Sequence, residues 1–159
     1  MHPDIFGALH RKNEVLAKLG ELASRNCLDE HQIGLARILR FKQNPGLLQA
    51  ALEYSAQIRK ASDILIAEVL NTLVAQDLTI STRASAAGVL GHLICRRPSD
   101  EATDFDLDFV VESMEHVLQR TKSRVIKKAL FEALELVRNK NLRNGGRTAI
   151  SSPPQKGTT

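Results

Sequence analysis

Seven stretches of the chain place apolar residues three or four positions apart, and this spacing limits the fold more than any other feature. On an α-helix such residues form one continuous stripe, whereas a half-buried strand needs strict alternation. Capping residues and prolines separate the stretches, because they begin or end helices at defined positions. The spacing therefore predicts seven helices, over about 4–25, 29–42, 45–60, 62–74, 81–97, 104–120 and 123–139.

Residues that favour helix N-termini stand before four of the expected helices. Their side-chain oxygens can accept a hydrogen bond from a backbone N–H group that has no partner within the helix. Pro45 adds a proline in a first turn, where its ring is tolerated, and Pro98 ends the fifth helix. The expected N-caps are Asn44, Ser62, Ser123, and either Ser81 or Thr82.

The composition favours an all-α protein. Aromatic residues make up only 4% of the chain, which also has few turn residues, with 9 Gly and 5 Pro. Sandwiches and barrels need more of both kinds. We expect one helical domain over residues 1–140. Residues 141–159 carry too few apolar side chains to offset the entropy of ordering them, so we expect a disordered, basic tail there.

Residues 77–93 read DLTISTRASAAGVLGHL, in which a turn aspartate precedes an arginine and then alanine and leucine at helical spacing. This order resembles the second half of a HEAT repeat. The resemblance implies that Asp77 lies in a turn near Arg83, because the family uses such a pair to fix its hairpin. The small residues that follow would let neighbouring helix axes approach closely.

A shift of 44 residues lays Leu90 on Leu134 and Arg83 on Lys127. HEAT and armadillo units repeat every ~40–47 residues. The resemblance therefore implies an all-α fold made of a short right-handed stack of antiparallel helical hairpins, a HEAT-like superhelix of about seven helices. The same spacing of Ala and Leu is also typical of an irregular helical bundle, and the sequence leaves that alternative open.

Charge is distributed unevenly along the chain. From residue 118 onward there are ten Lys and Arg against two acids, whereas 100–115 holds seven acids and no basic residue. Three interpretations compete: a solvated surface that follows the helix dipole, attraction between molecules, and contact with phosphates. The candidate contact residues are Arg120, Lys122, Arg124, Lys127, Lys128 and Arg138.

Phe131 is an apolar residue on the polar side of the last expected helix. The apolar stripe of that helix takes in Val125, Leu130 and Leu134, and Phe131 falls away from it. Either the tail covers this side chain, or it is an exposed anchor for a partner. A single exposed apolar residue is also common on protein surfaces.

The chain has no recognisable catalytic, cofactor or metal site. Its two cysteines, Cys27 and Cys95, form no CxxC pair, and neither Glu30-His31 nor Glu115-His116 has the spacing of a HExxH motif. Cys95 lies near a helix C-terminus, where the dipole disfavours a thiolate, so we expect it to be buried and inert. No apolar run has the length of a signal peptide or a membrane span, which indicates a cytoplasmic protein.

These features favour a non-catalytic scaffold that binds another macromolecule, most simply a protein. Stacked hairpins expose a continuous groove or ridge without needing a catalytic pocket. The alternative is a nucleic-acid-associated protein that contacts phosphates through its basic C-terminal third. Few aromatic residues are interleaved with the basic ones, which argues against the stacking of single-stranded bases. The exposed end faces of such a stack could also support self-association.

Overall fold

The computed structural model describes residues 5–97 and 107–151, with side chains up to residue 140. Over these ranges all regular secondary structure is helical, as predicted, and there is no strand. A short 3₁₀ helix, η1 (Leu28–His31), accompanies the α-helices. These are α1 (Lys12–Ser24), α2 (Gln32–Arg40), α3 (Pro45–Ser55), α4 (Asp63–Val74), α5 (Ile80–Arg96), α6 (Leu107–Arg120) and α7 (Arg124–Ser151).

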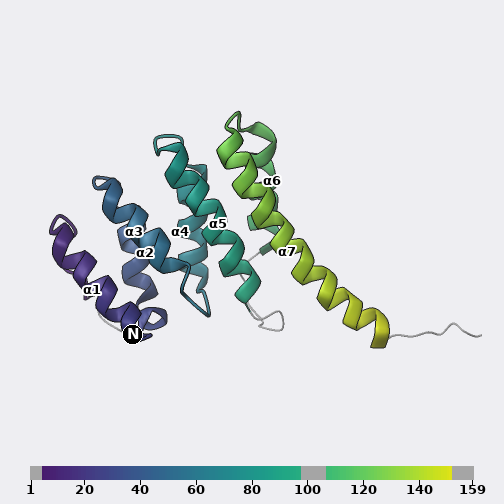
Figure 1. Cartoon of the computed structure of the whole chain (residues 1–159), viewed down its shortest axis with the longest axis horizontal. Helices are drawn as coiled ribbons and strands as arrows, with labels where there is room; N and C mark the ends of the chain where they lie inside the picture. Colours follow the sequence, from purple (N-terminus) through teal and green to yellow (C-terminus); the bar gives the residue numbers. More distant parts are fainter. Residues whose placement is uncertain (1–4, 98–106, 152–159) are drawn as a thin grey trace, which may run out of the picture.

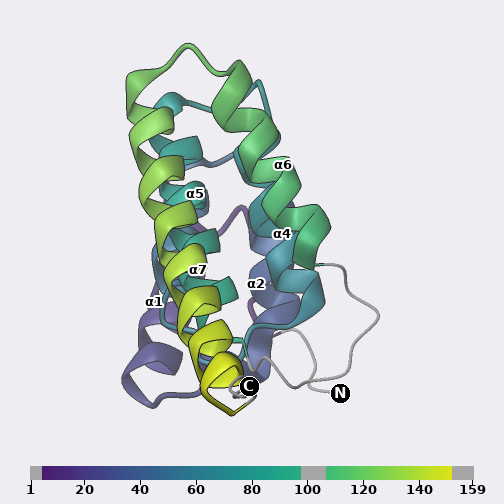
Figure 2. The same ribbon diagram turned by 90° about the vertical axis from the view of Figure 1, so that its right-hand side faces the viewer.

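The helices lie in two layers. In one layer α1, α3, α5 and α7 follow one another side by side, and in the other α2, α4 and α6 do so (Figures 1 and 2). Each helix of the second layer also packs against the next helix along the chain, so that α2–α3, α4–α5 and α6–α7 form antiparallel hairpins. The three hairpin turns lie at one end of the molecule (Figure 1).

The helix starts follow local capping chemistry. The side chains of Asn44, Ser62 and Ser123 accept hydrogen bonds from the N–H groups three residues later, at 3.1, 3.2 and 3.2 Å, which confirms these caps. The cap of α5 was assigned wrongly to Ser81 or Thr82. Thr79 fills that position, because its backbone is extended and its hydroxyl oxygen accepts from the N–H of Thr82 at 3.2 Å.

Two helix boundaries differ from the predicted ones. The first helix begins at Lys12 rather than near residue 4, because Gly7 adopts a left-handed backbone with φ of +68° that a helix cannot continue through. At the other end, α7 continues to Ser151, past the expected end near Asn139. Residues 141–151, which were expected to belong to a disordered tail, are therefore part of a helix. Extending a packed helix costs little free energy per residue. Residues 152–159, like Pro98 and residues 104–106, lie outside the described ranges.

The closest approach between hairpins is made by small residues, as predicted. A methyl group placed on Gly91 of α5 would come within 2.8 Å of the Cβ atom of Ala133 on α7. Leu90 and Leu134 lie on either side of this contact, and both are buried in the same hydrophobic core. The absence of a side chain at Gly91 therefore sets the distance between α5 and α7.

The last two hairpins match each other at a shift of 44 residues. This shift aligns the N-cap Thr79 with the N-cap Ser123, and it pairs buried residues such as Leu90 with Leu134. Several pairs differ in burial, and two of them involve phenylalanines. Leu65 and Ala87 are fully buried, whereas their counterparts Phe109 and Phe131 are 60% and 54% exposed. Phe131 lies on the face of α7 that, within the described ranges, no further helix covers.

Candidate functional site

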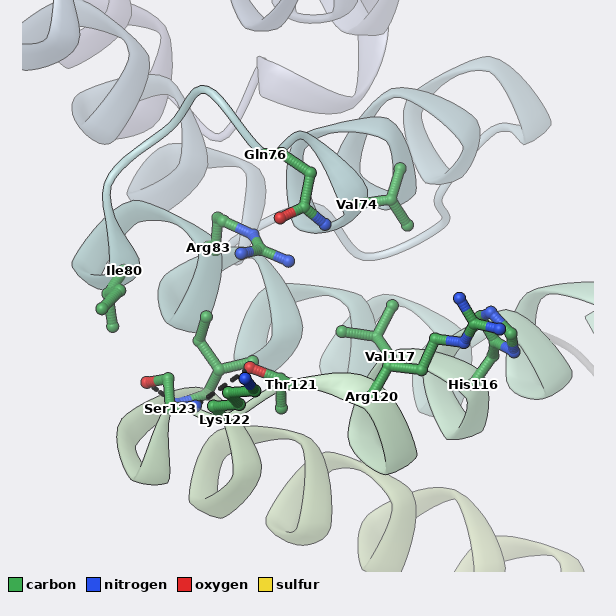
Figure 3. A pocket seen from close by; sticks show the side chains of 11 residues that line it. Val74, Gln76, Ile80, Arg83, His116, Val117, Arg120, Thr121, Lys122 and Ser123 are labelled. Atoms are coloured by element: carbon green, nitrogen blue, oxygen red, sulfur yellow. Dashed lines mark hydrogen bonds between the residues drawn. The ribbon is translucent and has the colours of Figure 1, made fainter.

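A groove of about 470 Å³ separates the turn ends of the last two hairpins (Figure 3). One wall comes from the end of α4, the turn after it and the first turn of α5. The other wall comes from the end of α6 and the turn that leads into α7. The lining residues are Val74, Gln76, Ile80, Arg83, His116, Val117, Arg120, Thr121, Lys122, Ser123 and Ile126.

The α6–α7 turn is held by a local hydrogen-bond network. The N–H of Thr121 donates to the carbonyl of Val117 at 2.8 Å, and the N–H of Ser123 donates to the hydroxyl of Thr121 at 3.2 Å. Ser123 in turn caps α7 through Ile126. Lys122 therefore lies on a fixed backbone at the rim of the groove, with its side chain exposed.

Arg83 is the most unusual residue of the groove, because its side chain is buried, with only 9% exposure. Its Nε donates to the carbonyl of Leu73, 2.8 Å away, which satisfies one of the free carbonyls at the end of α4. Within the described ranges, Arg83 forms no ion pair and its two Nη groups form no hydrogen bond. These groups are open to the groove, toward which Arg83 points in Figure 3.

The Asp77–Arg83 pair implied by the HEAT resemblance does not form. Asp77 does lie in the α4–α5 turn, but its carboxylate is exposed and lies 3.5 Å from the ammonium of Lys42. Arg83 instead faces the backbone of α4. The burial of Arg83 within α5 draws its guanidinium away from the exposed turn, which explains the difference.

The groove is electropositive. Arg83, Arg120 and Lys122 line it together with His116, and none of the described residues that line it is acidic. Cations that share a concave surface raise the local potential and attract anionic groups. The rest of the lining is apolar or carries hydroxyl and amide groups, so an anionic ligand could be recognised by both charge and shape.

A second hollow of about 360 Å³ continues the groove along α6. The two hollows share Val74, His116 and Val117, and the second adds Phe109 and Glu112. Phe109 is exposed at the position where the preceding hairpin buries Leu65. The full groove therefore has a basic end at the turns, whereas its other end combines the exposed ring of Phe109 with polar side chains that include Glu112.

The structure divides the predicted contact residues into three groups. Arg120 and Lys122 line the groove, and Arg138 pairs with Glu115 at 3.6 Å. Phe131 is exposed on the outer face of α7. Arg124, Lys127 and Lys128 are exposed on the first turns of α7, outside the groove lining.

Sequence reasoning missed that the side chain of Arg83 is buried and lines the groove, and it missed the contribution of Val74, Ile80 and Phe109. A signal for Arg83 exists, since it lies three and seven residues before the buried Ala86 and Leu90 and so falls on the buried face of α5. A signal also exists for Phe109, because the residues three, four and seven positions after it are Glu112, Ser113 and His116, which place it on the polar face of α6.

Other polar groups do not assemble into a second site. Within the described ranges, no three His, Cys, Asp or Glu side chains could hold a metal ion together. Cys95 is partly buried, and this burial raises the pKa of its thiol, while the nearby Lys140 acts in the opposite direction. A thiol with a raised pKa is a poor nucleophile at neutral pH.

Comparisons of the chain with protein-family models, with curated proteins and with solved structures found no match. No helix among the described residues is long and apolar enough to cross a membrane. Function is therefore inferred from the groove and from the surfaces beside it.

Proposed function

We propose that this chain is a non-catalytic scaffold, built as a short HEAT-like stack of helical hairpins, that binds another protein in the groove between its last two hairpins. The observation that carries the proposal is the exposure of Val74, Ile80 and Phe109 along this one groove. Clustered apolar residues on a concave surface mark sites of protein interaction, because their burial on binding is favourable.

Three observations support the HEAT-like arrangement. The helices lie in two layers, the hairpin turns share one end, and the caps Thr79 and Ser123 are 44 residues apart. Repeats of this kind expose long grooves and use them to bind partners. The exposed end face around Phe131 offers a further surface, on which a second copy of the chain could dock.

Site-specific photo-crosslinking in the native cell tests the proposal. A photo-crosslinking residue placed at Ile80 or at Phe109 is expected to form adducts with the same protein partner. Ile33, which is exposed on α2 outside the groove lining, provides the matched control and should not form them. Equal adducts from all three positions, or none from the groove positions, would contradict the proposal. An adduct with the mass of two chains would identify self-association instead.

Exposed cations on α7 favour nucleic-acid binding as the second candidate function. Arg124, Lys127 and Lys128 are exposed close to the groove cations Arg120 and Lys122. A protein that uses these residues on phosphates would bind duplex DNA with an affinity that falls steeply with salt. Its binding would also be lost when Arg124, Lys127 and Lys128 are replaced together by Glu. The scaffold proposal predicts neither effect.

A further inference from the structure

We propose that the basic end of the groove is a binding pocket for a carboxylate side chain of the partner protein, with Arg83 as its central contact. This inference rests on the proposed function, because it names the chemistry that the partner presents. Arg83 is buried and lines the groove, yet within the described ranges it has no carboxylate partner. A buried cation without a counter-charge is costly, so a site of this kind favours an anionic ligand.

The packing of the hairpin does not itself require an arginine at this position. The N-caps of α3 and α5 are Asn44 and Thr79, and the residue four positions after each cap is Leu48 in one helix and Arg83 in the other. Leu48 is buried in the hydrophobic core. The same place in two neighbouring hairpins is therefore filled by a leucine in one and by an arginine that opens into a groove in the other.

The geometry of Arg83 favours a carboxylate. Its Nε is already engaged by the carbonyl of Leu73, so the donors that remain are the two Nη groups at the end of the guanidinium. This end of the fork matches the two oxygens of one carboxylate. Arg120 and Lys122 lie at the rim, where they can attract an acidic segment without being buried.

The mixed lining of the groove favours a ligand that is part of a protein. Val74, Ile80, Val117 and Ile126 surround the cations, and the groove continues to Phe109. A peptide with an acidic residue and neighbouring apolar residues fits both ends. A nucleic acid would meet apolar side chains beside the cations, where phosphates gain nothing.

Peptide titration followed by NMR tests the pocket. The probe is the peptide acetyl-Ala-Glu-Leu-Glu-Ala-amide, and the matched control replaces both Glu residues with Gln. The acidic peptide is expected to shift the amide signals of Arg83, Lys122 and Ser123, and the Gln peptide is not. An equal response to both peptides, or no response to the acidic one, would overturn the proposal.

Variants assign the binding to Arg83. Arg83→Met is expected to lower the affinity for the acidic peptide by about tenfold or more, because a hydrogen bond between two charged groups is lost. Arg83→Lys keeps the charge without the fork and should retain part of the affinity, which keeps the test valid if the methionine variant folds poorly. Lys42→Gln, which removes a cation from an exposed pair outside the groove lining, should have no effect. Unchanged binding in both Arg83 variants would overturn the proposal.

Further outcomes test the choice of carboxylate as the ligand and distinguish failure of the pocket from failure of the scaffold proposal. Inorganic phosphate that displaces the peptide at lower concentration than acetate does, in an Arg83-dependent way, would overturn the choice of carboxylate. Crosslinks from Ile80 that persist unchanged in Arg83→Met would support the scaffold proposal and contradict the carboxylate pocket. Peptide binding that depends on Arg83, in a chain that forms no crosslinks, would support the pocket and contradict the scaffold proposal.

Discussion

Arginines near the two ends of α5 are both buried, but within the described ranges only one has a counter-charge. Arg97, at the C-terminal end, is 3% exposed and pairs with the carboxylate of Asp63, while its Nη1 donates to the carbonyl of Ala61 at 3.0 Å. Arg83, near the N-terminal end, donates to the carbonyl of Leu73 and has no acidic partner among the described residues. Arg97 thus contacts the segment that begins α4, and Arg83 contacts the segment that ends it.

The difference separates an arginine whose charge is paired within the fold from one that we propose binds a ligand. At Arg97 the cation is neutralised by the protein, so its removal would leave a carboxylate and a carbonyl without their partner. At Arg83 the charge is not neutralised among the described residues, so removal leaves only one carbonyl unsatisfied. Stability should therefore depend on Arg97, and binding on Arg83.

The largest effect is expected for Arg97→Met. The variant should lose up to about 3 kcal/mol of unfolding free energy, because it removes the ion pair of a buried guanidinium and its hydrogen bond to the carbonyl of Ala61. The value lies at the low end of the usual range since the Asp63 side chain is 43% exposed. Urea unfolding followed by circular dichroism measures the change. A variant as stable as the natural chain would contradict the stabilising role of Arg97.

Between the two arginines, Gly91 tests how tightly the middle of α5 is held against α7. Gly91→Ala is expected to destabilise the fold by about 1–3 kcal/mol, because the added methyl group would meet Ala133 at 2.8 Å. Gly88→Ala is the matched control on the same helix. Nothing lies within 4 Å of its added methyl group, so a gain of about 0.5–1 kcal/mol is expected from helix propensity. Equal effects on the midpoint of thermal unfolding would contradict the close contact.

For Arg83→Met the expected change in stability is below about 1 kcal/mol in either direction. The variant loses one hydrogen bond to Leu73, but it also removes a buried charge without a counter-charge. Urea unfolding side by side with Arg97→Met provides the measurement. A loss as large as that of Arg97→Met would mean that both arginines serve packing, and the comparison would fail.

The sequence predicted the local features of this molecule well. The caps at Asn44, Ser62 and Ser123 depend on a hydroxyl or amide three residues before a free N–H, and such chemistry is visible in any single chain. Periodicity also placed Leu90 and Leu134 in the core correctly. Both kinds of feature are decided within a few residues of the chain.

Features decided between helices were predicted poorly. The buried stripe of the last helix is expected to include Val125, yet Val125 is exposed and Ile126 is buried, because Ile126 lies four and eight residues before the buried Leu130 and Leu134. The groove around Arg83 depends on how far apart two hairpins lie. The implied partner Asp77 is only six positions away in sequence, but the burial of Arg83 separates the two charges.

A final prediction concerns the C-terminal end of α5, where Arg97 lies. Burial raises the pKa of the Cys95 thiol there, and the positive charge of Lys140 opposes this rise. Lys140 donates to the carbonyls of Ile94 and Arg97, so α7 reaches the end of α5 through this side chain. Lys140→Met should therefore raise the thiol pKa further, since the thiolate loses a nearby cation.

The measurement is the rate of iodoacetamide alkylation against pH, in a Cys27→Ser background so that only Cys95 reacts. The inflection should move to higher pH in Lys140→Met and stay in place in Lys128→Met, a control on an exposed part of α7. Because the folded thiol titrates above the unfolded one, its contribution to stability is complete below the unfolded pKa and is lost as the pH rises through the folded pKa. A shift to lower pH in Lys140→Met, or no shift, would contradict the influence of Lys140 on the Cys95 thiol.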